Sequence, residues 1–251
     1  DAKFFLDIIY KKLKIKKLDI NDWQKKCLQW KEDYSIENTI KFNNKGKISH
    51  YNFVNTLSKI LPENIVITTG SSGLGIEVFY TIFKNKKNQR IFLTSGLGSM
   101  GYGLPAAIGA YYSNFKKPLV LIEGDGSFQM NIQELALIRS YKIPICIIVM
   151  NNKGYASIRN TQKGYFNSRF VGTGPEAGIL YPNLEKISKA YNIPFLRISN
   201  VSNLEKELKK SMNRSWPLLV EINLIKNESL KPKVEALPKS DGSIVSMPLE
   251  D

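Results

Sequence analysis

The sequence predicts an α/β fold: a doubly wound, mostly parallel sheet with helices on both of its faces. Short apolar runs alternate with amphipathic stretches from about residue 50 to residue 225. Two of the runs, Leu119–Ile122 and Ile145–Met150, contain no polar residue other than a cysteine, as expected for strands buried on both faces. Glycine-rich or polar turns follow several runs, which is typical of strand-to-helix connections.

Residues 1–45 are expected to be helical and peripheral, as the tail of a preceding domain and a linker. Phe5, Ile9 and Leu13 recur at the spacing of one helix face, with lysines elsewhere. A basic amphipathic helix can lie on a membrane, but docking onto a neighbouring domain is the commoner outcome. Trp23 and Trp30 fall on one side of a second helix and are expected to pack together.

The βα alternation is expected to occupy residues 46–226. The expected strands are Ile65–Thr69, Ile91–Leu93, Leu119–Ile122, Ile145–Met150, Phe195–Ile198 and Leu218–Leu224. The expected helices are Tyr51–Leu61, one through Phe79 and Phe83, Pro105–Tyr112, Gln133–Lys142, one ending at Ala190, and Val201–Met212. Asn160–Leu184 is a long connection, expected to be either a mobile flap or a passive surface loop. Residues 227–251, with Pro232, Pro238 and Pro248, are expected to form an extended arm.

Composition limits the class of protein. The 251 residues are 43% hydrophobic and 23% charged, enough to bury a substantial core. No apolar run approaches the roughly 20 residues of a membrane helix, and no signal peptide opens the chain, which begins at Asp1 and is consistent with a piece of a longer protein. Cys27 and Cys146 make no disulfide framework, and Cys146 is expected in the core, so a reducing cytoplasm fits best.

The net charge of +14 raises a nucleic-acid hypothesis, but the lysines are spread along the whole chain, and a lysine-rich compositional bias is favoured. We therefore expect no nucleic-acid and no membrane partner. The sequence has a single histidine, His50, which excludes His-rich zinc sites. His50 follows a polar loop and is expected at the surface or at the start of a helix. Nothing near it resembles a nucleophile elbow, which argues against a Ser-His-Asp hydrolase.

Polar residues close two successive predicted strands: Gly124-Asp125-Gly126 and Asn151-Asn152. Because adjacent parallel strands end at the same edge, Asp125 and Asn152 are expected side by side, where open α/β sheets bind ligands. A carboxylate and a carboxamide oxygen suit Mg²⁺, which typically bridges to phosphates. The glycines flanking Asp125 let backbone N–H groups approach an anion. The pattern predicts a metal-bridged phosphate site.

The segment Gly96-Leu97-Gly98-Ser99-Met100-Gly101 matches the dinucleotide-binding pattern G-x-G-x-x-G, and Glu123 follows at the end of the next strand. Two details oppose a nicotinamide site. The expected helix starts at Pro105, so the third glycine comes too early to lie in it. A dinucleotide-binding fold also gives no reason for an aspartate between two glycines, Asp125, or for the Asn pair that follows it.

Three blocks, Gly96–Ala110, Gly124–Phe128 and Asn151–Tyr155, resemble the thiamine diphosphate enzymes in order and spacing, and within them most closely the acetolactate synthase large subunit. The resemblance covers about residues 45 to 225 and implies the thiamine diphosphate-binding fold. The first 40 residues resemble the end of that family's central domain, and Asp241–Asp251 resembles its C-terminus.

The resemblance implies a site residue by residue. Asp125, the Asn152 side chain and the Gly154 carbonyl would bind Mg²⁺, and Gly126 and Ser127 would hold the diphosphate. Gly98 and Met100 would bind the aminopyrimidine, with the Met100 side chain as a wedge beneath the cofactor rather than a core methionine. The full implied cofactor set is Ser71, Ser72, Gly98, Ser99, Met100, Gly124, Asp125, Gly126, Ser127, Asn152, Gly154 and Tyr155.

The resemblance also implies the reaction: decarboxylation of a small 2-oxo acid such as pyruvate, and transfer of the acyl carbanion equivalent to an acceptor. No catalytic residue is assigned in this chain, because the family's glutamate comes from an N-terminal domain of the partner subunit. A homo-oligomer, dimer or tetramer, is therefore implied, and this chain alone would be inactive. Thr161 stands where the synthases that make branched-chain precursors have tryptophan, so the acceptor substrate can differ from theirs. The alternatives are a decarboxylase, possibly of split-chain type, a nicotinamide-binding domain, and a basic binding module without catalysis.

Overall fold

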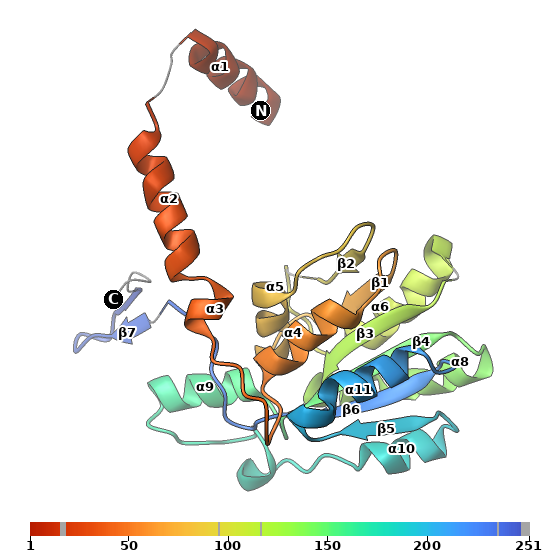
Figure 1. Ribbon diagram of the computed structural model, residues 1–251. Coiled ribbons are helices and arrows are strands. Elements are labelled where there is room, and N and C mark those ends of the chain that lie inside the picture. The colour runs from red at the N-terminus through yellow and green to blue at the C-terminus, as the bar shows by residue number, and fades with distance from the viewer. Residues whose placement is uncertain (16–18, 95, 116, 235, 247–251) are drawn as a thin grey trace. The chain divides into compact units, whose positions relative to one another are not determined.

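The computed structural model describes residues 1–15, 19–94, 96–115, 117–234 and 236–246 (Figure 1). The chain divides into two compact units, Asp1–Lys41 and Phe42–Asp251. The smaller unit is helical, as predicted, with α1 (Ala2–Ile15), α2 (Asn21–Asp33) and α3 (Ile36–Thr39). Trp23 and Trp30 of α2 meet edge to face, with ring centroids 5.7 Å apart, which confirms that they pack. Phe5, Ile9 and Leu13 of α1 are exposed.

A six-stranded parallel sheet forms the centre of the larger unit, with strand order β2-β1-β3-β4-β6-β5. This confirms the predicted doubly wound sheet. The connection from β1 leads outward to β2 on one side, and the connection from β3 leads to β4 on the other side. The topological switch point therefore lies between the neighbouring strands β1 and β3. The strands are β1 (Val66–Thr69), β2 (Arg90–Phe92), β3 (Leu119–Gly124), β4 (Ile145–Asn151), β5 (Phe195–Ile198) and β6 (Leu218–Asn223).

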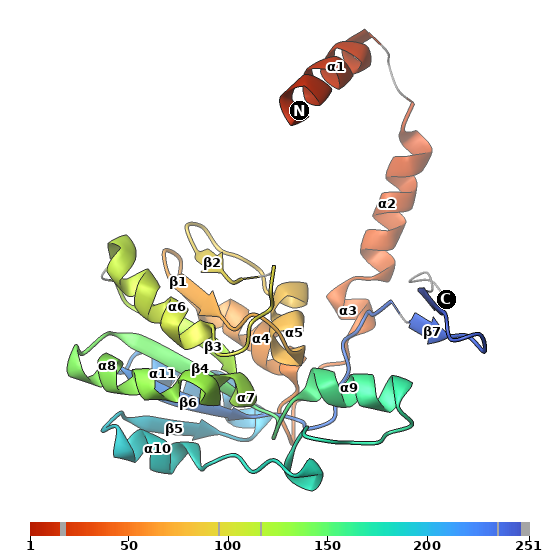
Figure 2. The ribbon, with the colours of Figure 1, turned by 180° about the vertical axis from the view of Figure 1, so that it is seen from behind.

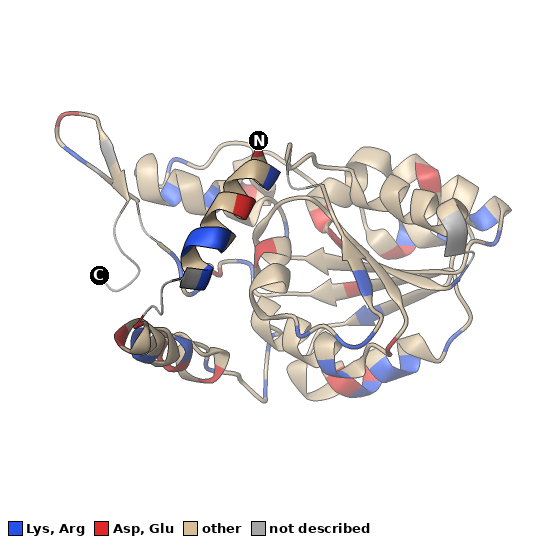
Figure 3. Ribbon diagram, turned by 90° about the horizontal axis from the view of Figure 1, so that it is seen from above, with Lys and Arg blue, Asp and Glu red and all other residues tan. Residues whose placement is uncertain are grey.

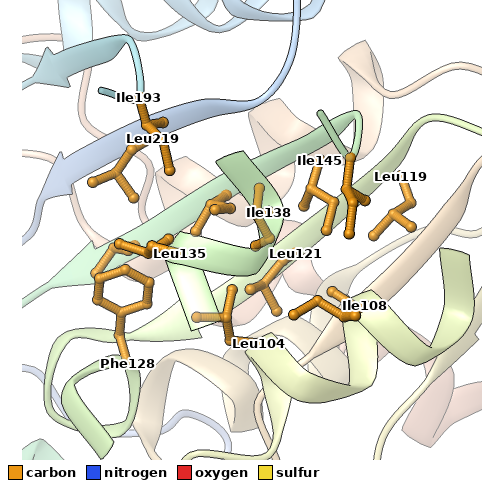
Figure 4. Close-up of a cluster of buried hydrophobic side chains, with 14 of the residues drawn as sticks. Leu104, Ile108, Leu119, Leu121, Phe128, Leu135, Ile138, Ile145, Ile193 and Leu219 are labelled. Carbon is orange, nitrogen blue, oxygen red and sulfur yellow. The ribbon is translucent and has the colours of Figure 1, made fainter. Parts of the chain in front are cut away.

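Helices cover both faces of the sheet (Figures 1 and 2). One face carries α4 (His50–Ile60), α5 (Leu74–Ile82) and α11 (Val201–Met212). The other carries α6 (Gly103–Ala110), α8 (Leu135–Ser140) and α10 (Leu184–Ala190), which bury a large apolar cluster against the strands (Figure 4). Phe128, Leu135 and Leu121 are almost completely buried in it. This packing makes the sheet edge a rigid support for the loops that follow the strands.

The structure corrects three predicted boundaries. Helix α6 begins at Gly103, not at Pro105. The helical segment after β3 begins at Asp125, with α7 (Asp125–Phe128) and a 3₁₀ turn (Gln129–Glu134) before α8, because Gly126 adopts helical backbone instead of forming a turn. The first part of the long connection is helix α9 (Ala156–Tyr165), and a short 3₁₀ turn (Pro175–Ala177) follows within it.

The C-terminal arm folds back on itself as an antiparallel pair, β7 (Ala236–Pro238) and β8 (Ile244–Ser246). Pro248 and the rest of 247–251, part of the segment that resembles the family's C-terminus, lie outside the described residues. Within the described ranges, none of the helices combines the length and apolar character needed to cross a bilayer. Figure 3 shows lysines and arginines on many elements, interspersed with acidic residues.

Candidate functional site

A cavity of about 360 Å³ lies at the carboxyl ends of β1, β3 and β4, at the switch point of the sheet. Its volume is within the range of small-ligand pockets. The walls come from the loop after β1, the start of α5, the glycine loop before α6, the start of α7 and the loop that leads from β4 into α9. Segments far apart in the sequence therefore converge at the edge where doubly wound sheets bind ligands.

Asp125 and Asn152 lie at this edge, as predicted, and both are buried and line the cavity. The two carboxylate oxygens of Asp125 accept hydrogen bonds from different segments. Oδ1 accepts from the Gly126 N–H at 2.8 Å, and Oδ2 from the Gly154 N–H at 3.0 Å. The Asp125 carboxylate thus ties the loop after β4 to the start of α7.

Only one of the two polar atoms of the Asn152 carboxamide, Nδ2, has a hydrogen-bond partner among the described residues. Its Nδ2 lies 3.2 Å from His50 Nε2, whereas its Oδ1 is buried and has no hydrogen-bond partner among the described residues. A buried acceptor without a donor is costly, so such an oxygen on a residue that lines the same cavity as a buried aspartate suits a cation. Among the described residues no group of three or more His, Cys, Asp or Glu side chains forms a metal site, so backbone oxygens would have to contribute.

Burial raises the pKa of Asp125 to about 6, while the hydrogen bonds from Gly154 and Gly126 and the charge of Arg159 oppose the rise. A cation near the carboxylate would restore the ionised form. The Arg159 side chain is itself buried and donates to four backbone carbonyls, those of Asn152, Lys153, Thr173 and Lys226. Arg159 therefore fixes the backbone around the site.

The glycine loop before α6 is joined to the same site. The Gly101 N–H donates to Ser127 Oγ at 2.7 Å, which connects the loop to α7. Met100 lines the cavity and its side chain is 41% exposed, so it is not a core methionine. Gly126 has no room for a side chain, since a Cβ there would lie 2.3 Å from Tyr155 Cε1.

Two of the predicted residues, Ser71 and Ser99, do not line the cavity. Ser71 is buried next to it, with a hydroxyl that lacks a partner among the described residues. The other ten do line it: Ser72, Gly98, Met100, Gly124, Asp125, Gly126, Ser127, Asn152, Gly154 and Tyr155.

His50 is a site residue that the sequence did not predict. It starts α4, which confirms one of its two expected positions, but it is fully buried and lines the cavity, so the surface alternative was wrong. A local signal exists: Ser49 caps α4 by accepting from the Asn52 N–H, which places His50 in the first helical turn. The other lining residues outside the predicted set are Gly73, Leu74, Gly75, Ile76, Glu77, Met150, Ala156, Ser157 and Ile158.

The sheet order and the cavity at its switch point define a doubly wound α/β domain with a ligand crevice at the strand ends. A family model described as "Thiamine pyrophosphate enzyme, C-terminal TPP binding domain" matches residues 69–222, more than half of the chain. The chain therefore belongs to this family of thiamine diphosphate-dependent enzymes.

Several curated relatives are acetolactate synthase large subunits. That of Porphyra purpurea is 30% identical over 239 residues, covering 91% of this chain and 37% of the relative. That of Lactococcus lactis is 33% identical over 181 residues, covering 72% of this chain and 30% of the relative. The chain thus spans about a third of the length of these relatives.

A solved structure supports the fold. Rhodococcus jostii RHA1 thiamine diphosphate-dependent 4-hydroxybenzoylformate decarboxylase matches with a TM-score of 0.63 at 20% identity. The match covers 76% of this chain and 34% of that one. At this identity the likeness shows a shared fold and no shared substrate.

Proposed function

We propose that this chain is the C-terminal, cofactor-binding portion of an acetolactate synthase-like enzyme. The enzyme decarboxylates a small 2-oxo acid of the pyruvate type and transfers the acyl carbanion equivalent to an acceptor. One observation carries the proposal: Asn152, whose buried Oδ1 has no hydrogen-bond partner among the described residues, lines the same cavity as Asp125. That pair of oxygens fits Mg²⁺ bound to a diphosphate.

Asp125, the Asn152 side chain and the backbone carbonyl of Gly154 are the proposed Mg²⁺ ligands. The N-terminal end of α7, at Gly126 and Ser127, would hold the diphosphate, and Gly98 and Met100 the aminopyrimidine. Bound thiamine diphosphate would supply a thiazolium carbanion and an electron sink for decarboxylation. The chain's own residues would hold and orient the cofactor, and Met100, partly exposed in the glycine loop, would pack against it from below.

The proposed enzyme is a homo-oligomer. We assign no acid or base for the cofactor in this chain and expect a glutamate from the N-terminal domain of a second subunit. The carboxyl of Glu123 is fully buried and does not line the cavity, which disfavours it for that role. The portion spanned here would then bind the cofactor without turning over substrate.

A second candidate is a thiamine diphosphate-dependent 2-oxo acid decarboxylase, possibly with its domains on two chains. Thr161 supports the decarboxylase as an alternative, because the resembling synthases that make branched-chain precursors carry tryptophan at this position. Product analysis with pyruvate separates the two: acetolactate indicates the synthase, and free aldehyde the decarboxylase.

Calorimetry of the full-length protein tests the proposal. Thiamine diphosphate with Mg²⁺ is titrated into one sample and NADH into another. We expect saturable binding of thiamine diphosphate that depends on Mg²⁺, and none of NADH. Binding of NADH with no binding of thiamine diphosphate would refute the proposal, and strong salt-sensitive DNA binding without cofactor affinity would favour a binding module.

A further inference from the structure

His50 is buried between two polar side chains from distant parts of the chain. Its Nδ1 lies 2.6 Å from Glu228 Oε2, and its Nε2 lies 3.2 Å from Asn152 Nδ2. The imidazole is completely buried, and its Glu228 partner is 17% exposed. A buried ring with both nitrogens engaged has a fixed orientation, since breaking either contact leaves an unsatisfied polar group.

Backbone pairing brings these three residues together. Ile48 forms an isolated parallel bridge with Leu224, and the Ile225 N–H donates to the Ile48 carbonyl at 2.9 Å. The Leu224 N–H in turn donates to the Asn151 carbonyl at 2.9 Å. The segment before α4, the end of β4 and the chain after β6 are thereby held in register. His50, Asn152 and Glu228 follow these pairs within a few residues.

The contacts of His50 favour one tautomer of the neutral ring. A carboxylate only accepts hydrogen bonds, so the proton lies on Nδ1 and is donated to Glu228. The backbone N–H of His50 donates to the same Oε2 at 2.8 Å, which fixes the carboxylate as well. Nε2 is left with a lone pair and accepts from the Asn152 Nδ2–H.

This tautomer determines how the Asn152 carboxamide is turned. With NH₂ held by His50, the opposite atom of the amide, Oδ1, is the one that lacks a hydrogen-bond partner among the described residues. The reverse orientation would place a carbonyl oxygen against the Nε2 lone pair, which is repulsive. The Asn152 backbone is fixed independently, because its carbonyl accepts from Arg159 Nη2 at 3.2 Å, and the same nitrogen donates to the Lys226 carbonyl at 2.8 Å.

We propose that His50, oriented by Glu228, is a positioning residue that turns the Asn152 carboxamide so that its oxygen is presented to the metal ion. The inference rests on the proposed function, in which Asn152 is a Mg²⁺ ligand. It adds a hydrogen-bonded partner behind the ligand, an arrangement that commonly changes metal affinity by about 10–100-fold. The chain after β6 thereby takes part in the metal site through Glu228 and Lys226.

A matched pair of variants tests the proposal in the full-length protein. In His50→Gln the side-chain amide reaches near the position of Nε2 and can still accept from Asn152. In His50→Asn the amide lies near the position of Nδ1, so the contact with Glu228 is kept and that with Asn152 is lost. Mg²⁺ affinity is measured by calorimetry at saturating thiamine diphosphate, and Mn²⁺ affinity from the free-ion signal in electron paramagnetic resonance. Thermal unfolding without metal monitors the fold of each variant.

We expect His50→Asn to weaken Mg²⁺ and Mn²⁺ binding by about 10–100-fold and His50→Gln to stay within about threefold of wild type. Equal affinities in all three proteins would overturn the proposal, and so would an equal loss in both variants accompanied by equal drops in Tm. A wild-type protein that binds neither metal nor thiamine diphosphate would instead refute the proposed function.

A double-mutant comparison separates positioning from a general loss of structure. If His50 acts through the Asn152 side chain, then His50→Asn has little further effect on Mn²⁺ affinity in an Asn152→Ala background. An undiminished effect in that background would overturn the proposal, because the two changes would then be independent.

Discussion

Glu123 is the carboxyl group whose titration most directly tests the packing beneath the site. It is fully buried at the end of β3, and neither of its oxygens has a hydrogen-bond partner of good geometry among the described residues. A Cβ added at Gly70 or Gly103 would lie 2.2 Å or 2.0 Å from one of these oxygens, so two glycines enclose the group. Burial raises the pKa of Glu123 from 4.5 to about 7, while nearby Ser127 and the amides of Gly103 and Gly124 oppose the rise.

The sign of the effect follows from linkage. The fold favours the neutral acid, so this contribution to stability is complete below pH 4.5 and is lost as the pH rises through about 7. At 1.36 kcal/mol per pKa unit, ionisation of Glu123 lowers the free energy of unfolding by about 2.5 kcal/mol between pH 5 and pH 8. The substitution Glu123→Gln keeps the shape and removes the titration.

The assay is urea unfolding of wild type and Glu123→Gln at pH 5, 6, 7 and 8 without cofactor, followed by circular dichroism. We expect the variant to gain about 2–3 kcal/mol relative to wild type from the lowest to the highest pH. Glu63→Gln, at an exposed position, controls for the substitution itself. A difference between Glu123→Gln and wild type that is the same at every pH would refute the reasoning.

Three further substitutions have distinct expected outcomes. Gly126→Ala should weaken thiamine diphosphate binding by calorimetry at least tenfold, because its Cβ would overlap the Tyr155 ring; unchanged affinity would contradict the tight contact. Arg159→Met should lower the free energy of unfolding by about 3–5 kcal/mol in urea, because four carbonyls lose a charged donor; a loss below 1 kcal/mol would count against this. Met100→Ala should leave Tm within a few degrees, because the side chain is 41% exposed, yet lower turnover of the assembled enzyme; a large drop in Tm with normal turnover would indicate a core residue instead.

The strands could be predicted because buried parallel strands need continuous apolar residues, and the runs in β3 and β4 have few other interpretations. The edge where these strands end follows from the geometry of a parallel sheet, and this geometry alone predicts that Asp125 and Asn152 lie at the same edge. The family motifs supplied Gly98 and Met100, which periodicity alone does not single out.

His50 could not be assigned to the site from the sequence, because its burial depends on the bridge between Ile48 and Leu224, a tertiary contact. The helix start at Asp125 was missed for a local reason: glycine on both sides of an aspartate is typical of a turn. Gly126 is helical here, and the close approach of the Tyr155 ring explains why a glycine stands there. Ser99 was assigned through its neighbours in the motif, and only the fold distinguishes it from Gly98 and Met100 on either side.

The proposed metal–diphosphate site is tested most directly by the Mg²⁺ dependence of thiamine diphosphate binding in Asp125→Ala and Asn152→Ala, measured by calorimetry on the full-length protein. Asp22→Ala, at an exposed position on α2, is the matched control. We expect both site variants to lose about 100-fold or more in Mg²⁺-dependent affinity, because each lacks one of the few proposed oxygen ligands, while the control binds as wild type does. Wild-type affinity in Asp125→Ala would contradict the assignment of this sheet edge as the metal–diphosphate site.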